Sequence, residues 1–251
     1  MSHKVRLDKL LVERGLAASR ERARALVLAG KVLVNEQKVE KAGAVIDPAA
    51  NVRVLGEDLK YVSRGGVKLE KALEHWQVDV RGRVCMDVGA STGGFTDCLL
   101  QHGAARVIAI DTGYGQMAYR LRQDPRVRLL ERTNARYLRA EDVGEPVDFV
   151  AVDVSFISAT LVLPAVIHAA RAGSRRRLAL VVLVKPQFEA GREAVTKGGI
   201  VRDARAQSQA VEKVRRAVLE LGAVQANFIE SPILGAEGNR EFLLHAVFEG
   251  L

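Results

Sequence analysis

The 251-residue sequence has little of what marks several protein classes. Its two cysteines, Cys85 and Cys98, lie in apolar runs with no second Cys or His at zinc-ligand spacing, which disfavours a disulfide framework or a metal site. The first nine residues lack the apolar region of a signal peptide. The longest aliphatic run, Leu178–Val184, is far shorter than the roughly 20 residues of a membrane-spanning helix. These absences predict a cytoplasmic protein without a metal or a membrane partner.

The chain also lacks internal repeats and low-complexity segments, and its 48% of apolar residues can supply a proper core. Lysine and arginine outnumber aspartate and glutamate by 38 to 30, which favours polyanionic partners such as nucleic acid. Residues 1–66 hold 13 basic and 8 acidic residues, so +5 of the net charge of +8 lies in the first quarter.

The first 60 residues predict a small α+β module. Leu7, Leu10 and Leu11 recur at helical spacing, and Ser19 is a good N-cap for a second helix that ends at Gly30. Short strands are then expected over residues 31–35, 38–39 and 51–55.

Basic residues of this module could grip phosphates, although a solvated helical face is the plainer interpretation. Three strings, residues 6–16, 19–23 and 29–35, resemble the S4 RNA-binding domain. The resemblance implies binding of structured RNA through its shape and backbone. The residues expected to contact RNA are Arg6, Lys9, Arg20, Arg22 and Lys31, together with Arg64.

From residue 84 onward, buried-strand runs alternate with helix-length segments, at residues 84–88, 106–111, 127–130, 147–153 and 178–184. This alternation predicts a parallel sheet with helices on both faces. The last two runs, residues 224–229 and 241–248, are joined by a loop too short for a crossover helix and should pair antiparallel.

The expected fold class is therefore α/β, resembling a class I methyltransferase: a Rossmann-like, mostly parallel seven-stranded sheet with an antiparallel last strand. The expected division is an S4-type domain over residues 1–60, a linker over 61–66 loosened by paired glycines, and a domain over 67–251 that resembles the class I methyltransferases.

The loop after the first strand of this sheet is rich in glycine and predicts a cofactor site. Its spacing is not G-x-G-x-x-G, which disfavours a nicotinamide cofactor. Asp111 ends the second strand, where a carboxylate can hold ribose hydroxyls, and Asn134 follows the third. A glycine loop serving only the strand-to-helix turn is the alternative. The expected cofactor-binding residues are Asp87, Gly89, Ala90, Ser91, Thr92, Gly93, Gly94, Phe95, Asp111, Asn134 and Asp153.

Four charged residues, Lys68, Asp153, Lys185 and Glu241, are expected at one rim of the sheet. Each alone could be a surface charge, a helix cap or an edge residue. Together, and in this order, they resemble the Lys-Asp-Lys-Glu tetrad of ribose 2′-O-methyltransferases. Strands four, five and seven should lie side by side, so that both carboxylates flank Lys185, the expected proton acceptor.

The whole chain resembles the TlyA, or haemolysin A, family of rRNA 2′-O-methyltransferases, in which an S4 domain precedes an FtsJ-like domain. The strings that carry the resemblance are residues 61–69, 87–97, 152–158, 184–189, 198–202, 231–235 and 238–241. It implies S-adenosyl-L-methionine as the cofactor and ribosomal subunits as partners.

The resemblance implies methylation of a cytidine ribose in 23S rRNA and, in some members, also in 16S rRNA; the compact chain favours the large subunit alone. A non-catalytic RNA-binding ribosome assembly factor remains an alternative. A membrane-active haemolysin is disfavoured, because the sequence has neither a spanning segment nor a long basic amphipathic helix.

Overall fold

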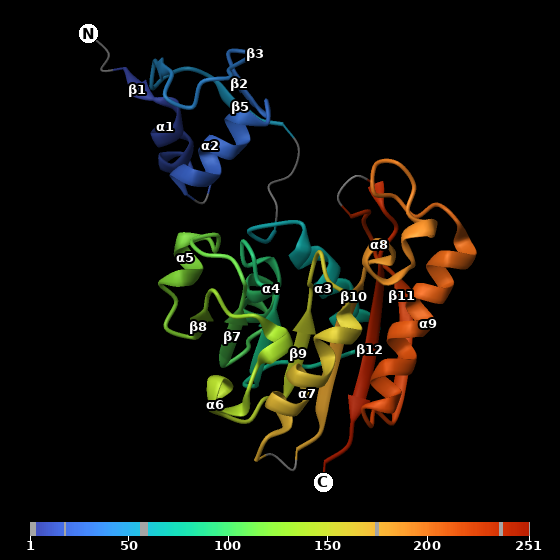
Figure 1. Ribbon diagram of the computed structural model, residues 1–251. Helices are drawn as coiled ribbons and strands as arrows, with labels where there is room; N and C mark the ends of the chain where they lie inside the picture. Colours follow the sequence, from blue (N-terminus) through green and yellow to red (C-terminus); the bar gives the residue numbers. More distant parts are fainter. Residues whose placement is uncertain (1–3, 18, 56–59, 174–175, 236–237, 251) are drawn as a thin grey trace. The chain divides into compact units, whose positions relative to one another are not determined.

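The computed structural model describes residues 4–17, 19–55, 60–173, 176–235 and 238–250 (Figure 1). The chain forms two compact units, residues 1–59 and residues 60–251. Each unit buries its apolar side chains in hydrophobic clusters of its own.

Two short helices, α1 (Leu7–Glu13) and α2 (Arg20–Leu28), dominate the first unit. Leu7, Leu10 and Leu11 are buried in the hydrophobic cluster of this unit, as their spacing predicted. The hydroxyl of Ser19 caps α2 by accepting a hydrogen bond from the Arg22 backbone N–H. The strands pair antiparallel, β1 with β4 and β2 with both β3 and β5. They are β1 (Val5–Arg6), β2 (Val32–Val34), β3 (Gln37–Lys38), β4 (Val45–Ile46) and β5 (Val52–Val54).

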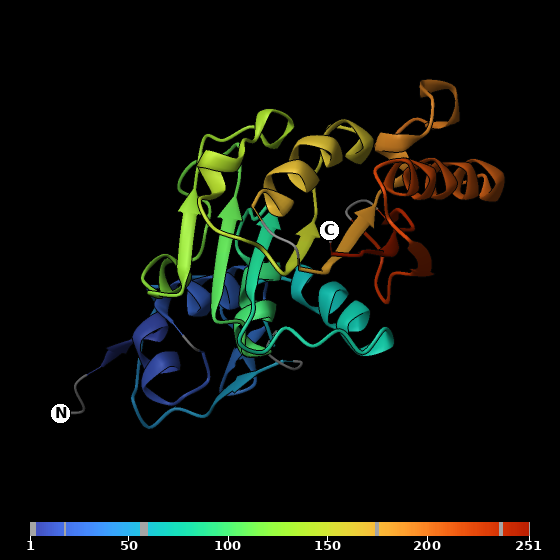
Figure 2. The same ribbon diagram turned by 90° about the horizontal axis from the view of Figure 1, so that it is seen from below.

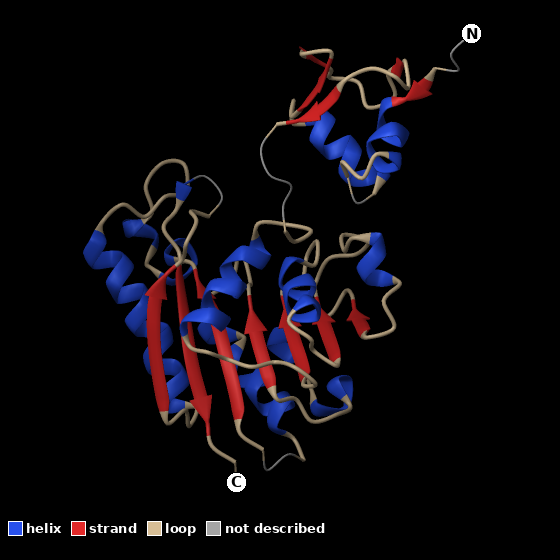
Figure 3. Ribbon diagram, turned by 180° about the vertical axis from the view of Figure 1, so that it is seen from behind, coloured by secondary structure: helices blue, strands red, loops and turns tan. Residues whose placement is uncertain are grey.

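The second unit is built on a seven-stranded sheet in the order β11-β12-β10-β9-β6-β7-β8, and Figure 3 shows its strands side by side. Its strands are β6 (Val84–Val88), β7 (Arg106–Ile110), β8 (Val127–Leu130), β9 (Phe149–Val152), β10 (Leu178–Val184), β11 (Gln225–Glu230) and β12 (Phe242–Phe248). The strands from β6 to β10 pair parallel, and β12 runs antiparallel to both β10 and β11. The predicted fold class is confirmed.

Helices cover both faces of this sheet, as Figure 2 shows. One hydrophobic cluster joins the sheet to α7 and α9 through side chains such as Val166 and Val214. A second cluster joins the opposite face to α3 and α4 through Leu69 and Leu99. The helices are α3 (Gly65–His75), α4 (Gly94–Gln101), α5 (Tyr119–Arg122), α6 (Ala140–Val143), α7 (Leu163–Arg171), α8 (Pro186–Glu189) and α9 (Ala204–Glu220), with 3-10 turns η1 (Ala135–Tyr137), η2 (Ala159–Leu161) and η3 (Arg192–Ala194).

Residues 61–66, expected to form a linker, are packed into the second unit. Tyr61 is 2% exposed, and its hydroxyl donates a hydrogen bond to the Glu70 carboxylate at 2.8 Å. Gly65 begins α3, and a Cβ on Gly66 would lie 2.3 Å from the Tyr61 ring. Gly66 therefore serves the close approach of Tyr61 to the first turn of α3, not flexibility.

In the parts of the chain that the structure describes, none of the helices has both the length and the apolar character needed to cross a lipid bilayer.

Candidate active site

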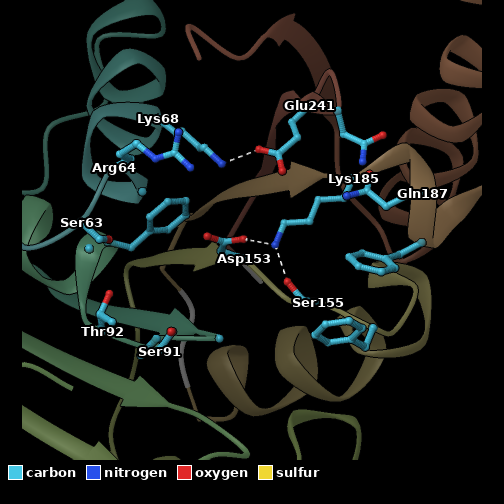
Figure 4. Close-up of a pocket in the computed structure, with 18 of the residues that line it drawn as sticks. Ser63, Arg64, Lys68, Ser91, Thr92, Asp153, Ser155, Lys185, Gln187 and Glu241 are labelled. Atoms are coloured by element: carbon cyan, nitrogen blue, oxygen red, sulfur yellow. Dashed lines mark hydrogen bonds and ion pairs between the residues drawn. The ribbon is translucent and has the colours of Figure 1, made fainter. Parts of the chain in front are cut away.

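The carboxyl ends of the parallel strands meet at one edge of the sheet, and the start of the antiparallel β12 lies at the same edge. Loops that follow β6, β9 and β10 there surround a cavity of about 610 Å³ (Figure 4). Its wall carries all four residues of the expected tetrad, Lys68, Asp153, Lys185 and Glu241. The topology thus gathers charged side chains that are up to 173 residues apart in the sequence.

Lys185 follows β10 directly, and Asp153 follows the neighbouring β9. Because these strands are paired in parallel, their ends deliver the two side chains to the same place. The Lys185 Nζ lies 2.6 Å from Asp153 Oδ1 and donates a hydrogen bond of 2.6 Å to the Ser155 hydroxyl. The ammonium group is thereby fixed at the cavity wall with both partners on one loop.

Lys68, from the second turn of α3, makes the other ion pair of the cavity, with Glu241 just before β12. Its Nζ lies 2.5 Å from Glu241 Oε2, and the two side chains are 11% and 3% exposed. Glu241 was expected beside Lys185, whereas the structure pairs it with Lys68. The tetrad is therefore two ion pairs, each with one lysine and one carboxylate, rather than one lysine between two acids.

A second cavity, of about 460 Å³, lies beyond the ends of β6 and β7. It shares Gly89, Ser91, Asp153, Ser155 and Phe156 with the first cavity, so the two spaces adjoin. Its walls combine polar residues, among them Asp111 and Asn134, with the apolar side chains of Ile110, Ala135, Ile157 and Val162. This mixture of apolar side chains and a carboxylate fits an adenosine group, with the carboxylate placed for ribose hydroxyls.

The glycine loop between β6 and α4 forms the floor shared by both cavities. Gly89 has φ +88°, and a Cβ there would lie 2.3 Å from the Asp153 carbonyl oxygen. The Ser91 backbone N–H donates a 2.7 Å hydrogen bond to Asp111 Oδ2, which ties this loop to the end of β7. Gly93 caps α4 at φ +95° and lies outside the lining of both cavities. The remaining expected loop residues, Ala90, Ser91, Thr92, Gly94 and Phe95, line the first cavity.

Asp87, expected to contact the cofactor, is fully buried inside β6 and lines neither cavity. The Thr96 hydroxyl donates a 2.6 Å hydrogen bond to its Oδ2. Burial raises the pKa of Asp87 to about 7, and the Thr96 hydrogen bond only partly opposes this. Asp87 thus holds the start of α4 behind the loop instead of facing a ligand.

This raised pKa predicts a pH dependence of folding. Between its ordinary pKa of 3.8 and about 7, native Asp87 keeps a proton that the unfolded chain has lost, so stability falls as the pH rises through this window. Asp87→Asn removes the titration and should gain up to about 4 kcal/mol relative to wild type between pH 4 and pH 8. Urea unfolding at both pH values measures the difference.

Asp124→Asn is the control for this prediction, because the Arg126 hydrogen bond lowers the pKa of Asp124 below its ordinary 3.8. Its contribution to stability changes only below about pH 4, so the stability difference between this variant and wild type should be nearly the same at pH 4 and pH 8. The buried His245, whose pKa burial lowers to about 4, titrates in wild type and variant alike and cancels in the comparison. Parallel pH curves for wild type and Asp87→Asn would contradict the assignment.

Several cavity residues were not expected from the sequence. Phe156 is 92% exposed at the mouth and has φ +64°, a strained backbone for a bulky residue. Its ring centroid lies 5.4 Å from that of Phe188 on α8. Ser155 and Gln187 also line the first cavity, as does Asn239. All five lie within three residues of a tetrad member, which is the signal that could have indicated them.

In the first unit, arginine side chains gather around a buried carboxylate. Asp8 is 0% exposed and accepts hydrogen bonds from Arg6, Arg20 and Arg24 at 2.9 to 3.3 Å. The Arg6 guanidinium, with help from the other two, holds the pKa of Asp8 well below its usual range. About half of each arginine side chain stays exposed, so the cluster presents oriented donors to the surface.

The other residues expected to contact RNA occupy separate positions. Lys9 pairs with Glu13 one helical turn away at 3.3 Å, Arg22 is half-buried on α2, and Lys31 is exposed before β2. Arg64 belongs to the second unit, where it is exposed and lines the first cavity beside Lys68 (Figure 4). Among the described residues, His, Cys, Asp and Glu side chains form no group of three or more able to hold a metal ion.

Similarity to known proteins extends over nearly the whole chain. The FtsJ-like methyltransferase family matches residues 61–248, and the S4 domain matches residues 5–52. The 16S/23S rRNA (cytidine-2′-O)-methyltransferase TlyA of Mycobacterium tuberculosis is 47% identical over 97% of this chain and 90% of that protein. This chain belongs to the TlyA family of FtsJ-like methyltransferases.

Two further relatives support the family. The YqxC protein of Bacillus subtilis is 48% identical over 99% of this chain and 88% of its own length. A solved structure of a hemolysin candidate from Streptococcus thermophilus is 42% identical, with a TM-score of 0.73 over 99% of this chain and 90% of that one. The chain is therefore a methyltransferase whose cofactor is S-adenosylmethionine, and the second cavity fits the adenosine part of that cofactor.

Proposed function

We propose that this protein transfers a methyl group from S-adenosylmethionine to the 2′-hydroxyl of a cytidine ribose in ribosomal RNA, with the large subunit as the substrate. The proposed reaction places the enzyme in the cytoplasm with the ribosomes. One observation carries the proposal: two lysine–carboxylate ion pairs lie in the first cavity, and this cavity adjoins the second cavity, which fits adenosine.

The cofactor is held by the loop of residues 89–95, the carboxylate of Asp111 and the side chain of Asn134 in this proposal. S-adenosylmethionine supplies a methyl group that its sulfonium has already activated. The protein's remaining task is to position a ribose oxygen and to remove its proton, because a neutral hydroxyl is a poor nucleophile.

Lys185 takes that proton in the proposed mechanism. Its Nζ is at the wall where the two cavities adjoin, and Asp153 and Ser155 fix its direction. Lys185 must first lose one proton to solvent water before it can accept another. The ribose hydroxyl then takes the place of the Ser155 hydroxyl as the hydrogen-bond partner of Lys185 Nζ. As the new C–O bond forms and the carbon–sulfur bond breaks, the hydroxyl proton passes to Lys185.

Lys68 and Glu241 orient the ribose from another part of the cavity wall. Both side chains are nearly buried, so their ion pair holds one geometry while the substrate enters. A positive group here also attracts the phosphates that flank the target ribose, as does the exposed Arg64 at the same wall. The arginine cluster around Asp8, with Lys9, Arg22 and Lys31, is proposed to hold structured RNA through its backbone.

Phe156 is expected to stack on the base of the target nucleotide. An exposed aromatic ring on a strained backbone at the cavity mouth offers a face to a base turned out of its helix. Replacing Phe156 by Ala removes this face and should raise the KM for RNA about tenfold, since base–aromatic stacking contributes about 1–3 kcal/mol. Steady-state rates measure the change.

Phe156→Tyr is the control, because it keeps the ring and should keep the KM. An unchanged KM for Phe156→Ala would remove the stacking role.

The proposed function is tested by incubating the protein with labelled S-adenosylmethionine and separated, unmodified ribosomal subunits, followed by mapping of the modified nucleotide. Label on a cytidine 2′-oxygen of the large-subunit RNA is the expected result. Label on a base, or on the small subunit alone, would contradict the proposed acceptor. No transfer to either subunit, with RNA binding retained, would favour a non-catalytic assembly factor.

A further inference from the structure

One stretch of the cavity rim takes no part in the tetrad or in the cofactor slot. Val195 and Gly199 line the first cavity only. Between them the chain closes a tight turn, in which the Thr196 hydroxyl donates a 2.7 Å hydrogen bond to the Ile200 carbonyl oxygen and the Gly199 N–H donates one of 3.0 Å to the Thr196 carbonyl oxygen. Gly198, at φ +100°, lets the turn close.

Two buried amides fix this turn from different elements. Asn239 is 2% exposed, and its Nδ2 donates a 2.9 Å hydrogen bond to the Gly199 carbonyl oxygen. Its Oδ1 accepts a 3.1 Å hydrogen bond from the Val201 N–H. Gln207 of α9 is 4% exposed, and its Nε2 donates a 2.8 Å hydrogen bond to the Val201 carbonyl oxygen. Both polar atoms of the Asn239 amide are thus hydrogen-bonded to backbone groups of the same segment.

The three hydrogen bonds from Asn239 and Gln207, together called the clamp, are more than an ordinary surface loop requires. Surface loops normally leave their backbone groups to water, whereas this segment has three of them bound by buried side chains. Removing either amide leaves a buried backbone group without its partner, which is costly in a protein interior. The clamp therefore preorganises a short turn at the edge of the substrate cavity.

The tip of the turn carries Lys197, which is exposed. Within the described ranges, Lys197 makes no ion pair with an acidic side chain. A cation on the rim of a cavity that receives a ribose can meet the phosphates on either side of that ribose, because these are the charges nearest to the sugar.

We propose that Asn239 and Gln207 hold residues 195–201 as a fixed rim of the ribose cavity, and that Lys197 on this rim binds a backbone phosphate of the target RNA strand next to the reacting ribose. Asn239 and Gln207 are positioning residues here, and Lys197 is the contact. The inference rests on the proposed RNA methyl transfer, because the rim is useful only to a substrate with phosphates beside its ribose.

The test uses the full chain, labelled S-adenosylmethionine and unmodified large ribosomal subunits. Lys197→Met should raise the KM for subunits about five- to tenfold, the effect of losing one charge-assisted contact. Its binding of RNA should also depend less steeply on salt, by about one unit of the logarithmic slope. Neither kcat nor the calorimetric Kd for S-adenosylmethionine should change, because the rim lies outside the second cavity.

Asn239→Ala and Gln207→Met should show the same pattern, a raised KM with an unchanged cofactor Kd. Gln207→Met separates the rim from the catalytic pair, because Gln207 lies on α9 whereas Asn239 is two residues from Glu241. Arg216→Met, which removes an exposed charge from α9 away from both cavities, is the control and should keep the wild-type KM.

A wild-type KM for Lys197→Met would overturn the phosphate contact. A loss of kcat in Asn239→Ala with wild-type kinetics in Gln207→Met would overturn the clamp, because Asn239 would then act through Glu241. If Asn239→Ala does not fold, the KM values of Gln207→Met and Lys197→Met test the proposal instead. Failure of the wild-type protein to label ribosomal RNA would instead reject the proposed function itself.

Discussion

Lys185→Ala is expected to reduce methyl transfer to ribosomal RNA by about 10²- to 10⁴-fold, the range for loss of a positioned proton acceptor. Cofactor and RNA binding should stay near wild type, because the Lys185 side chain lines the first cavity and is not among the residues that line the second cavity, which fits the adenosine group. Single-turnover transfer of a labelled methyl group, calorimetry with S-adenosylmethionine and filter binding of RNA measure the three quantities separately.

Lys185→Arg sharpens this test. The guanidinium keeps the positive charge and can still pair with Asp153, but it does not release a proton in proteins. It should therefore be nearly as inactive as Lys185→Ala. Substantial activity in Lys185→Arg would show that the charge orients the hydroxyl and would contradict proton transfer. Lys71→Met, which removes an exposed lysine of α3 that lines neither cavity, is the matched control and should stay active.

The sheet of the second unit was predictable because its strands are buried on both faces. Runs such as Leu178–Val184 are aliphatic throughout, and their alternation with helix-length segments allows few topologies. The short loop before β12 likewise predicted the antiparallel pairing with β11. The ends of the strands were predicted less accurately. Asp111 and Asp153 were expected inside strands, whereas β7 and β9 each end one residue before them.

The placement of three tetrad residues at one edge was also predictable, since strand order brings β9, β10 and β12 together, whereas Lys68 on α3 was assigned from the resemblance to the tetrad. Which lysine pairs with which carboxylate was not predictable. Whether Glu241 meets Lys185 or Lys68 depends on where α3 packs, and a helix outside the strand order has no register with β12 that a sequence can give. The expected cofactor contact of Asp87 was not predictable for a related reason. A polar residue near a strand end can point to the ligand or into the core, and here Asp87 accepts a hydrogen bond from Thr96 in the core.

Gly89→Ala is expected to lower the affinity for S-adenosylmethionine more than any other single methyl group added to the loop. The new Cβ would lie 2.3 Å from the Asp153 carbonyl oxygen, and this neighbour is backbone that cannot rotate away. A Cβ on Gly93 would instead meet the Leu121 side chain at 2.4 Å, which can move. Gly93→Val, with two further methyl groups, should nevertheless abolish S-adenosylmethionine binding.

Relief of the Gly89 clash must push the loop away from β9 or displace Asp153, and either movement distorts the floor shared by both cavities. We expect at least about a hundredfold weaker cofactor binding by calorimetry, equivalent to about 2.7 kcal/mol.

Gly222→Ala is the matched control, because Gly222 has a similar φ of +97° but open space around the added Cβ. It introduces the same backbone strain without the contact, and its affinity should stay at the wild-type value. Equal losses in both variants would assign the effect to strain and contradict the close approach; near wild-type affinity in Gly89→Ala would remove the loop from the cofactor site.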